Sequence, residues 1–212
     1  MPNKLTIKDK IIECVKVYSN NLKQKTDKRL VEMKGDDNSH YLIYRVLVVT
    51  SKEGELIDIY QNKGRFLYKY AGSFLEEVTI LCLEERFEHA QRKVKILNKL
   101  GSRPKTFEID CLVDKEAYEI KWRDSTTDGD HITKEHTRVK SIKDAGYKPI
   151  RIMFYYPNRT QAIRIQETLR TIYAGMDGEY FFGDEAWSYI KKKTRVDLKL
   201  ILEEIAREKT KG

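Results

Sequence analysis

The stretch Phe107–Trp122 has the sequence FEIDCLVDKEAYEIKW, which contains two short runs of alternating apolar and polar residues. The polar triplet Asp114-Lys115-Glu116 separates the two runs. Successive side chains on a strand point to opposite faces, so this alternation is typical of half-buried strands joined by a turn. The sequence therefore predicts a β-hairpin.

Three charged residues, Asp110, Glu119 and Lys121, share one face of the predicted hairpin. They do so if one core covers the apolar faces of both strands, which carry Phe107, Ile109, Cys111 and Val113 and then Tyr118, Ile120 and Trp122. Carboxylates are ligands that Mg²⁺ prefers, and a neighbouring lysine can orient a water molecule or stabilise charge on a phosphodiester. The same three residues also fit a solvated polar sheet face, because 35% of the chain is charged.

The composition favours a DNA- or RNA-directed protein over a membrane protein. The chain has 212 residues and a formal net charge of +8, which favours polyanionic partners. No apolar run approaches the length of a spanning helix, and the N-terminus lacks the apolar core of a signal peptide. The dispersed cysteines Cys14, Cys82 and Cys111 are expected to be buried free thiols of a cytoplasmic protein.

The elements around the hairpin are mainly helical. Amphipathic spacing predicts helices over about 4–25, 73–99 and 131–145, with residues 28–39 as a connector and residues 41–50 undecided between helix and strand. Ser73 is the expected N-cap of the second helix and Gly101 its stop. A buried strand over 149–155, a helix following Asn158 or Thr160, and two short helices over 184–193 and 196–207 complete the chain. This order predicts an α/β core with a mixed sheet flanked by helices.

The chain resembles the PD-(D/E)xK nuclease superfamily, to which many restriction endonucleases belong. The resembling motif is Ile109-Asp110, eight further residues, and Glu119-Ile120-Lys121, on a hairpin between a preceding helix and a following helix–strand unit. Ile109 stands where the superfamily has proline, and no separate strand is evident before Phe107. The acid that the superfamily adds on the preceding helix matches Glu76, with Glu77 as the alternative. Both acids also fit the first turn of an ordinary helix.

Within the superfamily, the resemblance extends to type II restriction endonucleases, including the ApaLI-like group. It covers about residues 73–156, and further segments flank that core. The expected organisation is an N-terminal mainly helical lobe over 1–72, a restriction-endonuclease-like catalytic core over 73–175 and a C-terminal helical extension over 176–212, together in one compact unit. Flanking segments of this kind carry DNA recognition and dimer contacts in such enzymes.

The resemblance implies Mg²⁺-dependent cleavage of double-stranded DNA that leaves 5′-phosphate ends. Asp110 and Glu119, with the backbone carbonyl of Ile120, would hold Mg²⁺, and Lys121 would lie beside the attacking water. Glu76 would contact that metal through water or bind a second one. The implied partners are double-stranded DNA, a second copy of the chain and a cognate DNA methyltransferase.

Five basic residues that follow the catalytic hairpin are candidates for DNA binding: Arg123, His131, Lys134, Arg138 and Lys140. Lys134 and Arg138 are four residues apart on the predicted helix, a spacing that suits two successive phosphates. An ordinary solvated helix face is the alternative interpretation.

Two other functions remain open at this point. One is a repair or Holliday-junction nuclease of the same fold. The other is a non-catalytic, basic nucleic-acid-binding protein, against which the intact set of Asp110, Glu119 and Lys121 argues.

Overall fold

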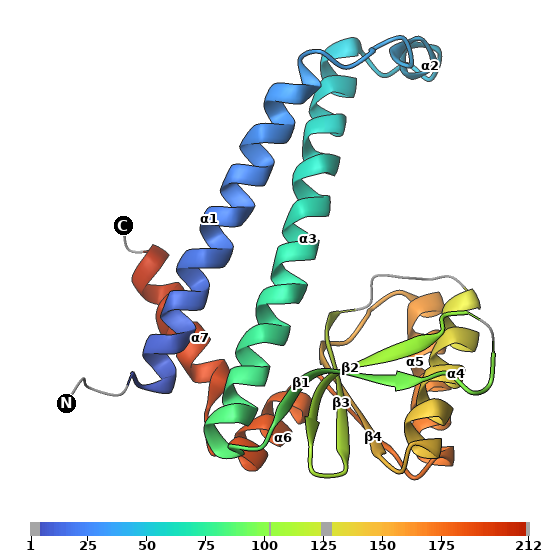
Figure 1. Ribbon diagram of the computed structural model, residues 1–212. Coiled ribbons are helices and arrows are strands. Elements are labelled where there is room, and N and C mark those ends of the chain that lie inside the picture. The colour runs from blue at the N-terminus through green and yellow to red at the C-terminus, as the bar shows by residue number, and fades with distance from the viewer. Residues whose placement is uncertain (1–4, 102, 124–128, 211–212) are drawn as a thin grey trace. The chain divides into compact units, whose positions relative to one another are not determined.

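The computed structural model describes residues 5–101, 103–123 and 129–210, except for the side chains of 129–131 and 210 (Figure 1). The described chain forms two compact units. One is Ile12–Phe74. The other combines the residues before Ile12 with those from Leu75 onward, and it contains the whole sheet.

The unit Ile12–Phe74 is helical and consists of most of α1 (Ile7–Met33), α2 (Tyr41–Val46) and the first part of α3 (Ser51–Arg86). The ring of Tyr18 on α1 lies 5.7 Å from that of Phe74 on α3, centroid to centroid. The predicted connector over 28–39 was wrong at its start, because α1 continues to Met33. Residues 41–46, which the sequence left undecided, are helical.

The start of α3 was also predicted wrongly, because Ser73 lies inside this helix and not at its N-cap. The actual start is a capping box, in which the Glu53 backbone N–H donates to Thr50 Oγ1 at 3.2 Å. The Thr50 backbone N–H donates in turn to Glu53 Oε2 at 2.8 Å. The motif Thr50-x-x-Glu53 is therefore the local signal for the start of this helix.

The second unit is built on a five-stranded sheet with the order β1-β2-β3-β4-β5. Its strands are β1 (Gln91–Leu97), β2 (Thr106–Val113), β3 (Glu116–Arg123), β4 (Lys148–Tyr155) and β5 (Glu179–Phe182). β1, β2 and β3 are antiparallel neighbours, whereas β3, β4 and β5 run parallel. The predicted hairpin and the predicted α/β class with a mixed sheet are therefore confirmed.

Two strands of this sheet were not predicted. The helix expected to reach Lys99 ends at Arg86, and β1 follows it. In β1, Val94 lies opposite Ile109 and Ile96 lies opposite Phe107, so pairing with β2 determines the structure of this segment. β5 lies in the segment expected to be only helical, and it pairs with β4.

The sheet carries helices on both faces (Figure 1). Met153 of β4 packs in one cluster with Val139 of α4 (Gly129–Asp144) and Leu169 of α5 (Thr160–Gly175). The next residue, Phe154, has its ring 4.3 Å from that of Trp187 of α6 (Asp184–Thr194). Neighbouring residues on a strand point to opposite faces, so α4 and α5 cover one face and α6 the other.

The C-terminal helix α7 (Leu198–Thr210) lies beside the beginning of α1, because Lys8 Nζ and Glu204 Oε2 form an ion pair at 2.8 Å. Cys14, Cys82 and Cys111, all among the described residues, form no disulfide; Cys82 and Cys111 are buried as predicted, whereas Cys14 is half-buried. Among the described helices, none is long and apolar enough to cross a membrane.

Gly178, between α5 and β5, lies where a side chain would collide with backbone. An added Cβ would lie 2.6 Å from the carbonyl oxygen of Pro149 and 3.0 Å from that of Tyr173. We expect Gly178→Ala to lower the free energy of unfolding by about 1–3 kcal/mol, measured by urea denaturation.

Gly175→Ala is the matched control, because an added Cβ there meets nothing within 4 Å. We expect this control to change the free energy of unfolding by less than about 1 kcal/mol. Any change should be a gain, because alanine favours the helix more than glycine does. Equal effects of the two substitutions would contradict the steric explanation.

Candidate active site

The candidate site lies where β2 and β3 stop pairing. Their ladder joins Val113 to Glu116, Leu112 to Ala117 and Cys111 to Tyr118. Two residues beyond Tyr118, the Ile120 backbone N–H donates to Asp110 Oδ2 at 2.8 Å. A side-chain carboxylate therefore replaces the backbone partner that a continued ladder would supply, which fixes the Asp110 carboxylate between the two strands.

The apolar alternation of β2 is interrupted at this point. Phe107 lies under the guanidinium of Arg138 on α4, and Phe107 and Ile109 share a cluster with Leu112 and with Ile142 of α4. Phe107 and Leu112 are an odd number of residues apart, so strict alternation would place them on opposite faces. This shared cluster departs from the strict alternation that was expected to place Phe107, Ile109, Cys111 and Val113 on one face.

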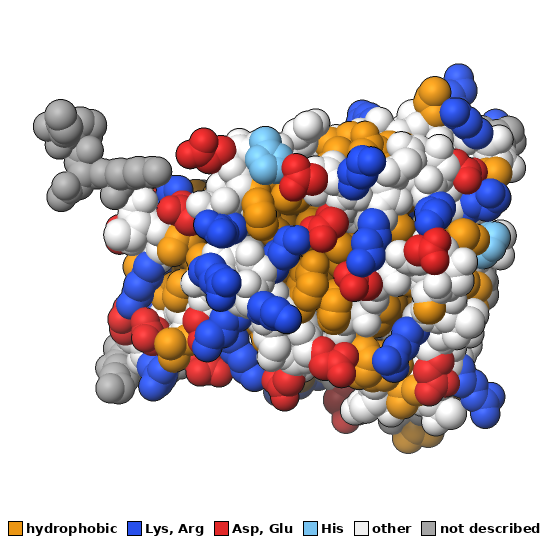
Figure 2. Space-filling view, turned by 90° about the horizontal axis from the view of Figure 1, so that it is seen from below, with side chains coloured by type: hydrophobic (Ala, Val, Ile, Leu, Met, Phe, Trp, Pro, Cys, Tyr) orange, Lys and Arg blue, Asp and Glu red, His pale blue; other side chains and the backbone are white. Residues whose placement is uncertain are grey.

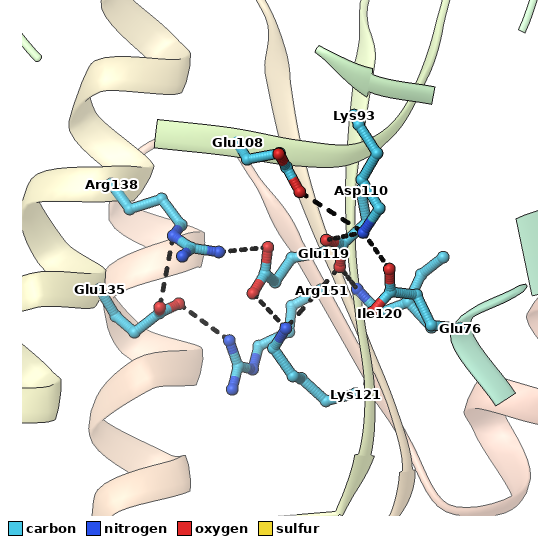
Figure 3. A network of polar contacts seen from close by, with 10 residues as sticks. All are labelled: Glu76, Lys93, Glu108, Asp110, Glu119, Ile120, Lys121, Glu135, Arg138 and Arg151. Atoms are coloured by element: carbon cyan, nitrogen blue, oxygen red, sulfur yellow. Dashed lines mark hydrogen bonds and ion pairs between the residues drawn. The ribbon is translucent and has the colours of Figure 1, made fainter. Parts of the chain in front are cut away.

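Asp110, Glu119 and Lys121 nevertheless come together (Figure 3). Lys121 Nζ lies 2.5 Å from Glu119 Oε1 and 3.7 Å from Asp110 Oδ2. The ammonium thus bridges two carboxylates that come from adjacent strands. It supplies the positive charge that two neighbouring buried carboxylates require.

The two carboxylates are buried but differ in their electrostatics. Asp110 is 6% exposed and Glu119 is 2% exposed. Burial, reinforced by the negative charge of Glu119, raises the pKa of Asp110 to about 6. Burial would also raise the pKa of Glu119, but the cations Lys121, Arg138 and Arg151 lower it to about 2. Glu119 is therefore the permanently ionised member of the pair.

A network on the α4 side holds Glu119. The Arg138 guanidinium forms an ion pair with Glu119 Oε2, and Arg138 Nε lies 3.5 Å from Glu135 Oε1. Glu135 Oε2 accepts a hydrogen bond of 2.9 Å from Arg151 of β4. Neither Glu135 nor Arg151 was predicted from the sequence as part of the site. A charged residue inside the buried strand β4, such as Arg151, was the available signal, because it needs a buried partner.

Glu76 lies on the other side of Asp110. Its carboxylate forms an ion pair with Lys93 of β1, and Lys93 Nζ lies 3.6 Å from Asp110 Oδ1. Glu77 instead pairs with Arg92 at 2.6 Å. Of the two acids considered, Glu76 is therefore the one connected to Asp110. It is not a first-turn acid, because α3 begins at Ser51.

A family model for ApaLI-like restriction endonucleases matches residues 1–207. The chain belongs to this family. The match confirms the resemblance inferred from the motif Ile109-Asp110 and Glu119-Ile120-Lys121. Neither the curated proteins nor the solved structures include one that matches the chain. Restriction endonucleases act on DNA and generally use a divalent metal ion, so this ApaLI-like restriction endonuclease is an endodeoxyribonuclease by family.

The donor set of this ApaLI-like endonuclease fits such a metal. Mg²⁺ binds proteins through one or two carboxylates and keeps several waters, which Asp110, Glu119 and the Ile120 carbonyl can provide for. Glu119 Oε1 is buried and lies 2.5 Å from the Lys121 ammonium. In the part of the chain described here, no group of three or more Asp, Glu, His or Cys side chains forms a ready metal cage.

The predicted DNA-binding residues differ in their surroundings. Arg123 and Lys134 are exposed, and Lys140 pairs with Asp144 at 3.2 Å. Arg138 points to Glu119 and Glu135 and is therefore part of the carboxylate network, so it does not form an outward pair with Lys134. The side chain of His131 lies outside the described residues.

Proposed function

We propose that this ApaLI-like restriction endonuclease is a type II enzyme that uses Mg²⁺ to hydrolyse double-stranded DNA at a specific sequence and leaves 5′-phosphate ends. The observation that carries the proposal is the position of Lys121 Nζ within 3.7 Å of both Asp110 and Glu119, at the point where β2 and β3 separate. This arrangement gathers oxygen ligands and a proton-bearing cation at one place.

Each residue of the site has a separate task. Asp110, Glu119 and the Ile120 carbonyl would hold Mg²⁺, which when bound lowers the pKa of water and neutralises charge on the phosphate. The Ile120 N–H orients Asp110, and Arg138 orients Glu119. Lys121 would orient the attacking water and stabilise negative charge on the phosphate oxygens. Glu76 would act from the far side of Asp110.

DNA contacts would come from basic residues at the end of β3 and along α4: Arg123, His131, Lys134 and Lys140. DNA binding of this kind does not require a uniformly basic surface. Figure 2 shows one face of the molecule on which Lys and Arg side chains are intermixed with Asp and Glu. The net charge of +8 still attracts DNA at a distance. Residues that grip phosphates near the scissile bond would set its position relative to Lys121.

The proposal includes a homodimer and a cognate DNA methyltransferase in the cytoplasm. Palindromic sites match the twofold symmetry of a dimer, and each protomer would then cut one strand. A methyltransferase would protect the same sequence in the host chromosome.

Digestion of a plasmid with and without Mg²⁺ tests this function. We expect discrete fragments with Mg²⁺, their loss with a chelator, and run-off sequencing ends that share one sequence and can be religated. Cutting restricted to branched DNA would instead support a repair or junction nuclease. Salt-dependent binding without any cleavage would support a non-catalytic DNA-binding protein.

A further inference from the structure

Lys93 of β1 lies among three carboxylates, on the other side of Asp110 from Lys121 (Figure 3). Its ammonium forms an ion pair with Glu76 and lies 3.5 Å from Glu108 Oε1 and 3.6 Å from Asp110 Oδ1. An ammonium has three N–H donors, which matches the number of these acids. Although partial burial opposes it, the hydrogen bond to Glu76 and the charge of Asp110 raise the pKa of Lys93, which is therefore a permanent cation.

The backbone at Lys93 has a left-handed conformation with φ of 53°. Such a conformation is unfavourable for a residue with a Cβ and persists where the surroundings hold it. Its strand neighbours Arg92 and Val94 lie opposite Cys111 and Ile109, so Lys93 stands across from Asp110. The conformation therefore occurs at the position of β1 that faces the first ligand of the proposed metal site.

Asp110 is shared between two lysines. Its Oδ1 faces Lys93, whereas its Oδ2 accepts the Ile120 N–H and faces Lys121. Without Lys93, the carboxylates of Glu76, Glu108 and Asp110 would repel one another around a common point. Hard oxygen ligands arranged in that way attract a divalent cation.

We propose that Lys93 is a built-in cation that occupies the place of a second divalent metal, so that each chain binds a single metal ion at Asp110 and Glu119. The inference rests on the proposed function of that site. Lys93 acts as a positioning residue, because it holds Glu76 and Asp110 and neutralises them.

The test is to count bound Mn²⁺ by electron paramagnetic resonance of the free ion. We expect the wild-type chain to bind a single Mn²⁺ and Lys93→Met, which keeps the length but loses the charge, to bind a second. Lys93→Arg should keep the wild-type count. Lys95→Met is the matched control, because Lys95 is an exposed residue of the same strand, and it should not change the count.

The dependence of cleavage on Mg²⁺ gives an independent measurement. Below saturation, the cleavage rate should rise in proportion to the Mg²⁺ concentration for the wild type and with its square for Lys93→Met. Should Lys93→Met fail to fold, Lys93→Gly removes the same charge at a backbone position that glycine adopts without strain, and it should also bind a second Mn²⁺.

Two results would overturn the role of Lys93 and leave the proposed metal site intact. One is a wild-type chain that binds two ions. The other is folded Lys93→Met and Lys93→Gly chains that bind the wild-type number of ions. A wild-type chain that binds no Mn²⁺ and does not cleave DNA would overturn the proposed metal site itself. The two failures are therefore distinguishable.

Discussion

Lys121→Ala is expected to lower the cleavage rate of this ApaLI-like endonuclease by roughly 10³-fold, since removal of a single preorganised charge-stabilising group costs about 10²–10³ in rate. The ammonium of Lys121 contacts Glu119 at 2.5 Å and Asp110 Oδ2 at 3.7 Å, so it bridges the two proposed metal ligands. Single-turnover cleavage of a plasmid in Mg²⁺ measures the effect.

DNA affinity should change little in the same variant. It is measured in Ca²⁺, which fills oxygen sites and which we expect not to support cleavage. Lys143→Ala is the matched control, because Lys143 pairs with Asp177 at 2.5 Å on an exposed surface and belongs to no part of the site. This control should cleave at the wild-type rate. Wild-type cleavage by Lys121→Ala would remove the catalytic role assigned to Lys121.

Glu135→Ala is expected to reduce the free energy of unfolding by about 3–5 kcal/mol, because it leaves a buried cation without its partner. Arg151 is 2% exposed and donates to Glu135 at 2.9 Å, and Glu135 itself is 4% exposed. Water cannot replace the lost carboxylate at such depth without opening the packing between α4 and β4. Chemical denaturation followed by circular dichroism measures the change.

Glu179→Ala is the control for this loss, because Glu179 pairs with Lys148 at 3.0 Å while both side chains remain 41% exposed. An exposed pair contributes less than about 1 kcal/mol. The double variant Glu135→Met/Arg151→Met should recover much of the stability lost by Glu135→Ala, since apolar side chains can replace a buried ion pair. A small effect of Glu135→Ala would show that the Arg151 charge is solvated in another way.

Glu135→Ala should also weaken metal binding. Arg138, which holds Glu119, lies 3.5 Å from Glu135, so removal of Glu135 loosens the orientation of a proposed ligand. Loss of such a supporting group costs about 10–100-fold in metal affinity, measurable by Mn²⁺ titration of the folded variant.

The hairpin and its charged residues could be predicted because the signal is local. Alternation over a few residues and a polar turn are sufficient to specify two strands, and the motif then places Asp110, Glu119 and Lys121 on them. The same reasoning failed for β1, whose apolar residues Val94 and Ile96 fit a helical stripe as well as a strand. Pairing with β2, the next strand along the chain, settled that segment.

The sequence by itself determined the α/β class, the hairpin and the acids and lysine of the candidate site, because these depend on the order and spacing of neighbouring residues. Tertiary structure alone decided that Glu76 and not Glu77 connects to Asp110, that Arg138 turns to Glu119, and that Lys93 lies among three carboxylates. Those contacts join side chains from different strands and helices. Their partners depend on strand register, helix phase and the need of each buried charge for an opposite charge, and none of these is visible in a short stretch of sequence.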